Sequence, residues 1–151
     1  MSTGDAIVMT LALASTWAMA GVIWVIQVVH YPAFDAIERG PDDSAWVAYG
    51  ERHRASISFV VGPFMAIEGA TGIWIVVSPP GDASLVLPLV AFALMGVAYG
   101  VTAFVSVPYH ERLTHRFDAD ALRGLIRTNW WRTAAWTLRG IVLGVLLVVA
   151  V

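Results

Sequence analysis

The sequence predicts an all-α integral membrane protein, a four-helix bundle with helical extensions on the cytoplasmic side and both termini outside. Composition is the first observation behind this prediction: 58% of the 151 residues are apolar and 13% are charged, with a mean hydropathy of +0.72. Soluble domains have roughly 45–50% apolar and 25% charged residues. The second observation is that four apolar stretches reach the roughly 20 residues that a helix needs to cross the hydrocarbon core of a bilayer.

Residues 1–151 are interpreted as a single domain with four spans. The predicted spans cover residues 6–29, 57–77, 85–107 and 133–151. A turn-forming cluster, Ser78-Pro79-Pro80-Gly81-Asp82, ends the second span. Helix-capping residues in the Asp42-Asp43-Ser44 segment and at Asp118 predict that helices two and four begin outside the membrane. These extensions and the end of helix three would form a small helical crown on the cytoplasmic side of the bundle.

The distribution of arginine predicts the orientation of the chain. The basic residues of the two long connections are Arg39, Arg52, Arg54, Arg112, Arg116, Arg123, Arg127 and Arg132. Because cytoplasmic loops carry an excess of Lys and Arg, we expect both connections in the cytoplasm, and the N-terminus, the Pro-Pro-Gly turn and the C-terminus outside. The lipid bilayer is therefore the main predicted partner. The net charge of −2 gives no reason to expect nucleic acid as a partner.

Two charged residues, Glu68 and Arg139, interrupt predicted spans. An isolated charge at that depth costs at least about 2.5–3.5 kcal/mol, so these opposite charges are expected to pair inside the bundle. Arg139 ends a polar stripe on the fourth helix that would open toward the cytoplasm. The residues predicted to line a buried polar cavity are Glu68, Arg139, Arg132, Asn129, Trp136 and Gln27. The alternative is that the ion pair only fixes helix register.

All histidines lie at the predicted cytoplasmic end, and the chain has no cysteine. Imidazole and carboxylate are then the ligands left for zinc, manganese or iron, and two histidines from different helices suit the axial positions of haem. His30 and His110 lie in similar segments, residues 28–32 and 106–110, and are expected to share one site. Gln27 precedes His30 by three residues and is expected to orient an imidazole. The candidate metal ligands are His30, His110, His115, Glu111 and His53.

Three segments support a resemblance: His30-Tyr31-Pro32-Ala33-Phe34, residues 62–72 and residues 127–140. They resemble a group of short, four-span bacterial membrane proteins, and the resemblance extends over most of the chain. It implies a multi-pass protein of the bacterial plasma membrane and brings no activity with it. In size and number of spans the chain is also similar to anthrone-oxygenase-like membrane proteins, a similarity of shape that gives no residue a role.

Two classes of function stay open at this point. The first is a membrane oxidoreductase or oxygenase that binds a transition metal or haem and acts on a lipophilic substrate. The second is a non-catalytic accessory subunit or small oligomeric transporter in which the Glu68–Arg139 pair is structural. The Gly-xxx-Gly spacings at Gly96 and Gly100 and at Gly140 and Gly144 favour close helix packing, within the bundle or between protomers of a homo-oligomer.

Overall fold

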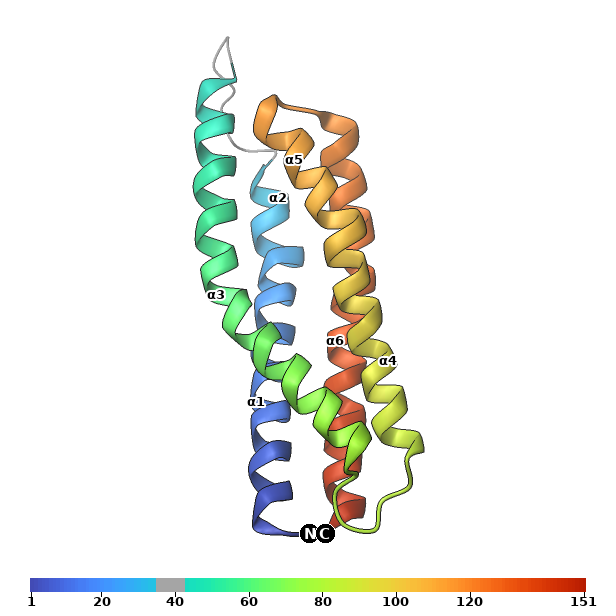
Figure 1. Cartoon of the computed structure of the whole chain (residues 1–151). Helices are drawn as coiled ribbons and strands as arrows, with labels where there is room; N and C mark the ends of the chain where they lie inside the picture. Colours follow the sequence, from blue (N-terminus) through green and yellow to red (C-terminus); the bar gives the residue numbers. More distant parts are fainter. Residues whose placement is uncertain (35–42) are drawn as a thin grey trace.

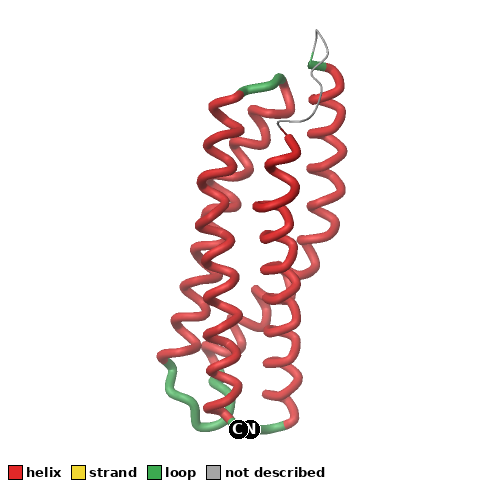
Figure 2. The backbone as a smooth tube through the Cα atoms, turned by 180° about the vertical axis from the view of Figure 1, so that it is seen from behind, coloured by secondary structure: helices red, strands yellow, loops and turns green. Residues whose placement is uncertain are grey.

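The computed structural model describes residues 1–34 and 43–151, and the regular structure in these ranges is helical. In chain order the elements are α1 (Thr3–Val25), η1 (Ile26–His30), α2 (Tyr31–Ala33), α3 (Ser44–Val77), α4 (Val86–Val101), η3 (Thr102–Ser106), α5 (Val107–His115) and α6 (Ala119–Ala150). The long helices run side by side, and both chain ends lie at the same end of the bundle (Figures 1 and 2). Arg39 and Asp42, which entered the orientation and capping predictions, lie outside the described residues.

Four continuous helical segments are long and apolar enough to cross a membrane. They are Thr3–Ala33, Ser44–Val77, Val86–His115 and Ala119–Ala150, and to within one residue each contains one predicted span. The prediction of an all-helical chain with four long apolar helices is confirmed. Two apolar clusters form its core, one around Met9, Ile75 and Leu143 and the other around Ile23 and Leu125.

The helix α3 bends in its middle, and this bend decides which neighbours it meets (Figure 1). Pro63 lies inside α3 and has no N–H to donate to the carbonyl one turn earlier, which is a common cause of a kink. Beyond the bend, α3 crosses toward α4, whereas its first half lies beside α1 and α5. Most residues of that first half are exposed, and a groove lies between it and α1.

The start of α3 packs against α5, and α5 against α6, at the end of the bundle opposite the chain termini, and we call this end the crown. Trp46, near the start of α3, donates through Nε1 to the carbonyl of Leu113 in α5 at 2.8 Å. Asp43 precedes α3 with a positive φ of 54° and does not cap the helix through its side chain. Its carboxylate instead accepts a hydrogen bond from the backbone N–H of Phe117 at 3.1 Å. The start of α3 is thereby tied to the α5–α6 turn.

Asp118 caps α6 as its sequence position predicts. Its carboxylate accepts hydrogen bonds from the backbone N–H groups of Asp120 and Ala121 at 3.0 and 2.9 Å. Arg112 donates to the other carboxylate oxygen at 2.5 Å. The N–H of Ala121 and then the Arg112 guanidinium lower the pKa of Asp118, so the cap stays ionised at neutral pH. From this cap α6 runs unbroken to Ala150.

Two π-helical turns, which the sequence analysis did not predict, interrupt the first and third long helices. In η1 the N–H of Tyr31 bonds to the carbonyl of Ile26, and in η3 the N–H of Val107 bonds to that of Thr102. Each π turn directly precedes a short helix with proline in its first turn. A proline ring clashes with the carbonyl four residues earlier, and a widened turn moves that carbonyl aside.

Only some of the glycines in the Gly-xxx-Gly spacings are sites of close helix packing within the bundle. Gly140 packs against Trp17, because a Cβ on this glycine would lie 2.8 Å from the indole ring. Gly96, Gly100 and Gly144 have no atom within 4 Å of such a Cβ. Within the described residues, therefore, only Gly140 of this group packs closely against another helix of the same chain.

Gly81 supplies the first testable position. It has a φ of +58°, and a Cβ there would lie 2.6 Å from the carbonyl oxygen of Ala150. A left-handed conformation costs other residues about 1–2 kcal/mol, so Gly81→Ala should lower the free energy of unfolding by at least about that amount. Thermal unfolding of the detergent-solubilised chain measures the change. In the control, Gly96→Ala, the added Cβ meets open space and should stabilise the helix by up to roughly 1 kcal/mol. Equal losses in both variants would contradict the described turn.

Candidate functional site

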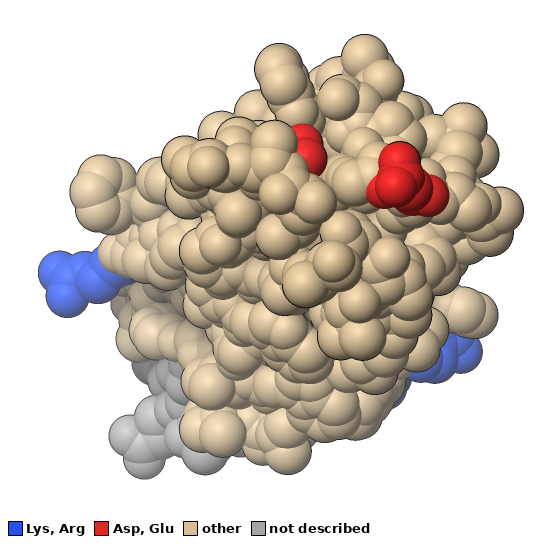
Figure 3. Space-filling view, turned by 90° about the horizontal axis from the view of Figure 1, so that it is seen from below, with Lys and Arg blue, Asp and Glu red and all other residues tan. Residues whose placement is uncertain are grey.

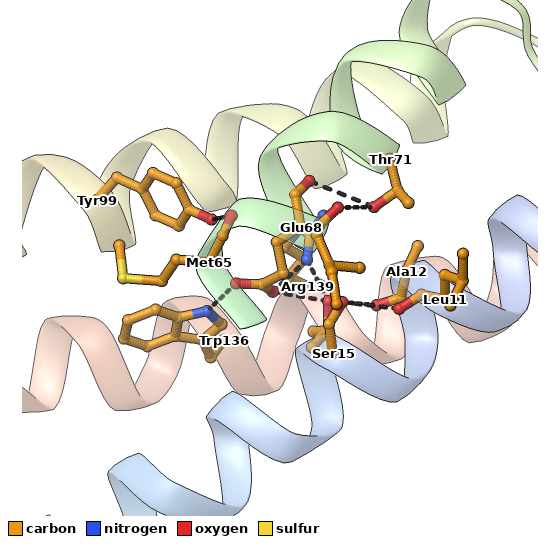
Figure 4. A network of polar contacts seen from close by, with 11 residues as sticks. Leu11, Ala12, Ser15, Met65, Glu68, Thr71, Tyr99, Trp136 and Arg139 are labelled. Carbon is orange, nitrogen blue, oxygen red and sulfur yellow. Dashed lines mark hydrogen bonds and ion pairs between the residues drawn. The ribbon is translucent and has the colours of Figure 1, made fainter. Parts of the chain in front are cut away.

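A buried ion pair joins α3 to α6. Arg139 donates through Nη1 to Glu68 Oε1, and the two side chains are 1% and 0% exposed. The same carboxylate oxygen accepts a hydrogen bond from Thr16 Oγ1 of α1 at 2.8 Å, and Oε2 accepts one from Trp136 Nε1 at 3.0 Å. The pairing predicted from the opposite charges is confirmed, and three helices contribute to it (Figure 4). Both carboxylate oxygens have partners, which a buried charge requires.

The indole of Trp136 connects this network to a second polar group on α6. Its ring lies below the guanidinium of Arg132, whose Cζ is 5.4 Å from the ring centroid. Arg132 donates through Nη1 to Asn129 Oδ1 at 3.1 Å and reaches Ser106 Oγ in η3 at 3.4 Å. All four residues are buried. The polar stripe predicted on the fourth helix therefore faces the interior of the bundle.

Gln27 is part of this second polar group and forms its hydrogen bonds there, not with a histidine. Its Oε1 accepts a hydrogen bond from Asn129 Nδ2 at 2.8 Å, and its Nε2 lies 3.5 Å from the carbonyl of Ile126. This corrects the expectation that Gln27 orients an imidazole. The cause is η1, because a π turn contains more residues than an α turn, so Gln27 and His30 do not share the face that α-helical spacing predicts.

A cavity of about 120 Å³ lies on the crown side of the ion pair, between α1, α3, the η3–α5 segment and α6. This volume suits several water molecules, at about 30 Å³ each in the liquid, or part of a small organic molecule. The walls are mainly apolar, and the polar groups include Tyr31, His53, Ser106, His110 and Arg132. Tyr31 follows η1 directly, and Ser106 ends η3, so both π turns contribute to this lining.

The location of the cavity differs from the expectation in one respect. Of the residues predicted to line it, Arg132 does so, and the lining does not include Glu68, Arg139, Trp136, Asn129 or Gln27. These residues are buried, and their polar groups bond to one another, to neighbouring side chains or to the backbone, apart from Arg139 Nε, which has no partner. The ion pair is thus a closed network beside the cavity and not its floor.

Three of the predicted metal ligands gather beside the cavity. The ring of His53 on α3 stacks on that of His30, with centroids 4.4 Å apart, and lies 5.9 Å from the ring of His110 on α5. His30 and His110 were expected to share a site, and the structure places His53 between them. The hydroxyl of Tyr49 lies 3.3 Å from His30 Nδ1. Ring contacts therefore join η1, α3 and α5 at this level.

No family model, curated protein or solved structure matches this chain. What the site does must therefore be argued from its own geometry, because a fold by itself does not define a function. The resemblance of the chain, through residues 30–34, 62–72 and 127–140, to short four-span bacterial membrane proteins stays a prediction.

Two predicted ligands remain. Glu111 and His115 are exposed on α5. Within residues 1–34 and 43–151, no group of three or more His, Asp and Glu side chains is arranged to hold one metal ion. The rings of His30 and His53 are stacked, with planes 27° apart, so their in-plane nitrogen lone pairs run side by side and do not converge on one point.

Two hydroxyl groups of the site were not predicted from the sequence. Thr16 bonds to Glu68, and Ser106 contacts Arg132. A single hydroxyl in an apolar helix usually bonds to its own backbone, as Ser15 does with Leu11, so these positions carried no signal of a partner.

The ion pair generates the second prediction. Removing either Glu68 or Arg139 leaves an unpaired buried charge and should cost roughly 3–5 kcal/mol of stability. The double variant, Glu68→Gln with Arg139→Gln, should cost less than the sum of the single variants because the lost interaction is shared. Thermal unfolding in detergent measures all three. The matched control is Arg127→Gln, an exposed arginine on the same helix, which should change stability by less than about 0.5 kcal/mol. Additive losses at positions 68 and 139 would mean that the pair does not interact.

Proposed function

We propose that the chain spans a membrane with the crown in the cytoplasm and both termini outside. Large apolar side chains are exposed along the helices, among them Phe59 and Phe104, each 83% exposed. Such a surface suits contact with lipid and would favour aggregation in water. The face at the chain termini is largely uncharged, with acidic atoms on it and basic atoms only at its margin (Figure 3). The arginine excess at the other end supports a cytoplasmic crown.

The third prediction tests this topology with single cysteines in a chain that has none. Cysteines at Ser44 and Asp120 should resist a membrane-impermeant thiol reagent in intact cells, because both positions lie in the crown. A cysteine at Asp82, in the turn near the chain termini, should react. All three should react after the membrane is permeabilised, which serves as the control for accessibility. Reaction of Asp120→Cys in intact cells with no reaction of Asp82→Cys would reverse the orientation.

We further propose that the protein binds a small lipophilic molecule in the cavity. The observation that supports this function is the composition of the lining: apolar walls from α1 and α3, with a few polar groups at one side. Ligand pockets are typically apolar with a small number of placed polar groups, and those of helical bundles lie between the helices. A membrane location would let a lipophilic molecule enter from the bilayer.

A second candidate is a transition metal or haem at the histidines, which would make the protein a membrane oxidoreductase or oxygenase. It is favoured by the approach of His53 to His110, since both line the same cavity. Against it stand the stacked arrangement of His30 and His53 and the exposure of Glu111 and His115 to solvent. Binding of a lipophilic molecule in the cavity does not require these side chains to change position, and it is the function we favour.

The fourth prediction tests occupancy of the cavity. A dodecyl diazirine should label peptides from α1 and α3 that line the cavity, and excess dodecanol should suppress this labelling because the site is saturable. Val61→Trp places a large ring in the lining and should reduce the saturable labelling at least about tenfold. Phe59→Trp is the matched control, because Phe59 lies on the same helix and points outward. Mass spectrometry of the labelled peptides gives the readout.

Two results would count against ligand binding. Labelling that dodecanol does not suppress would show only contact with lipid-facing surfaces. A stoichiometric metal or haem that is lost in His53→Ala and in His110→Ala would instead favour the second candidate, which elemental analysis and a visible spectrum of the same preparations would reveal.

A further inference from the structure

Two arginines of α6, about two helical turns apart, are buried in different ways. Arg139 is paired with Glu68. Arg132 is 8% exposed, and its described hydrogen-bond partners, Asn129, Ser106 and the hydroxyl of Tyr31, are neutral. Its Nε has no partner, as is also true of Arg139. A buried guanidinium without a counter-charge is costly, so the surroundings of Arg132 lack one negative charge that those of Arg139 contain.

The cavity beside Arg132 has the charge that an anion requires. Its only charged lining residues in the described part of the chain are Arg132 and Arg54, so no carboxylate competes for the guanidinium. The imidazoles of His53 and His110 and the hydroxyl of Ser106 add hydrogen-bonding groups around the same space. An anionic group bound there would be a counter-charge for Arg132, as Glu68 is for Arg139.

A second void shows where the rest of such a molecule would lie. A groove between α1 and α3 shares Val22, Ile26, His53 and Ile57 with the cavity. It continues along Gly21, Val25 and Val60, which are exposed on the outside of the bundle. The groove is therefore adjacent to the cavity, and it lies on the surface that would face lipid. The groove is almost entirely apolar, so an alkyl chain suits it.

We propose that the cavity binds an amphiphile with a single anionic head group, a carboxylate, that pairs with Arg132 while its alkyl chain lies in the groove between α1 and α3. This inference rests on the proposed ligand binding and specifies its chemical class. A monoanion is favoured over a phosphate dianion because one buried guanidinium neutralises one charge, and Arg54 is exposed. Carboxylates also match the two-pronged geometry of a guanidinium.

The test compares head groups on the wild-type chain in an uncharged detergent. Thermal unfolding is followed while laurate, dodecanol or inorganic phosphate is added. Laurate should raise the unfolding temperature with a half-saturating concentration at least about tenfold below that of dodecanol, since only laurate supplies the charge. Phosphate should leave the unfolding temperature unchanged at the same concentrations.

Variants then test separately where the head group and where the alkyl chain of the ligand bind. Arg132→Gln should weaken laurate binding at least about tenfold, and Arg132→Lys should weaken it less because the positive charge remains. Gly21→Leu should also weaken laurate, because it fills the groove without touching Arg132 and its Cβ meets no atom within 4 Å. Gly96→Leu, equally open but on α4, is the control and should bind laurate like the wild type.

The outcomes separate this inference from the function on which it rests. Equal binding of laurate and dodecanol would overturn the anionic head and leave lipophilic binding standing, whereas binding of neither would overturn both. Phosphate that binds as tightly as laurate would overturn the amphiphile, because a free anion would then suffice. Unchanged laurate binding in Arg132→Gln would overturn the role of Arg132. If that variant does not fold, the head-group comparison and Gly21→Leu still decide.

Discussion

The Glu68–Arg139 pair is the interaction on which the arrangement of the bundle depends. Neither charge is tolerable alone in an apolar interior, so the two helices that carry them must meet at this level. Thr16 adds α1 to the contact, and Trp136 occupies the second carboxylate oxygen. Apolar packing between helices is compatible with many relative positions of the helices. The hydrogen bonds and the ion pair of this network form at only one of these positions. It therefore selects the register of α1, α3 and α6.

That register in turn decides where the second arginine of α6 lies. With Arg139 held on Glu68, the regular helix places Arg132 toward the crown on the same face, where η3 contributes Ser106, α3 contributes His53 and α5 contributes His110. The closed ion pair and the open cavity are two consequences of one polar stripe. They differ because α3 carries a glutamate opposite one arginine and leaves space opposite the other, where the bend at Pro63 directs its first half away from α4.

The two π turns give the cavity its local shape and relate the two halves of the chain. Each ends one long apolar helix and precedes a short helix with proline in its first turn; η1 brings Gln27 to Asn129, and η3 brings Ser106 to Arg132. Counted from the ends of the two π turns, His30 corresponds to Ser106 and Pro32 to Pro108, so the similar segments at residues 28–32 and 106–110 are offset by two residues in the fold. Both π turns contribute residues to the cavity lining, and π turns in proteins frequently lie at functional sites.

The sequence by itself determined the helices, the crown, the cap at Asp118 and the pairing of Glu68 with Arg139. These follow from local rules, because apolar length, capping side chains and the cost of an isolated charge act at each position whatever the neighbours. Tertiary structure alone decided that Gln27 faces Asn129, that His53 separates His30 from His110, and that the cavity opens beside Arg132 and not beside the ion pair. The physical reason is that a π turn changes which side chains share a face and a bend changes which helices meet, and neither is contained in the regular spacing from which sequence predictions start.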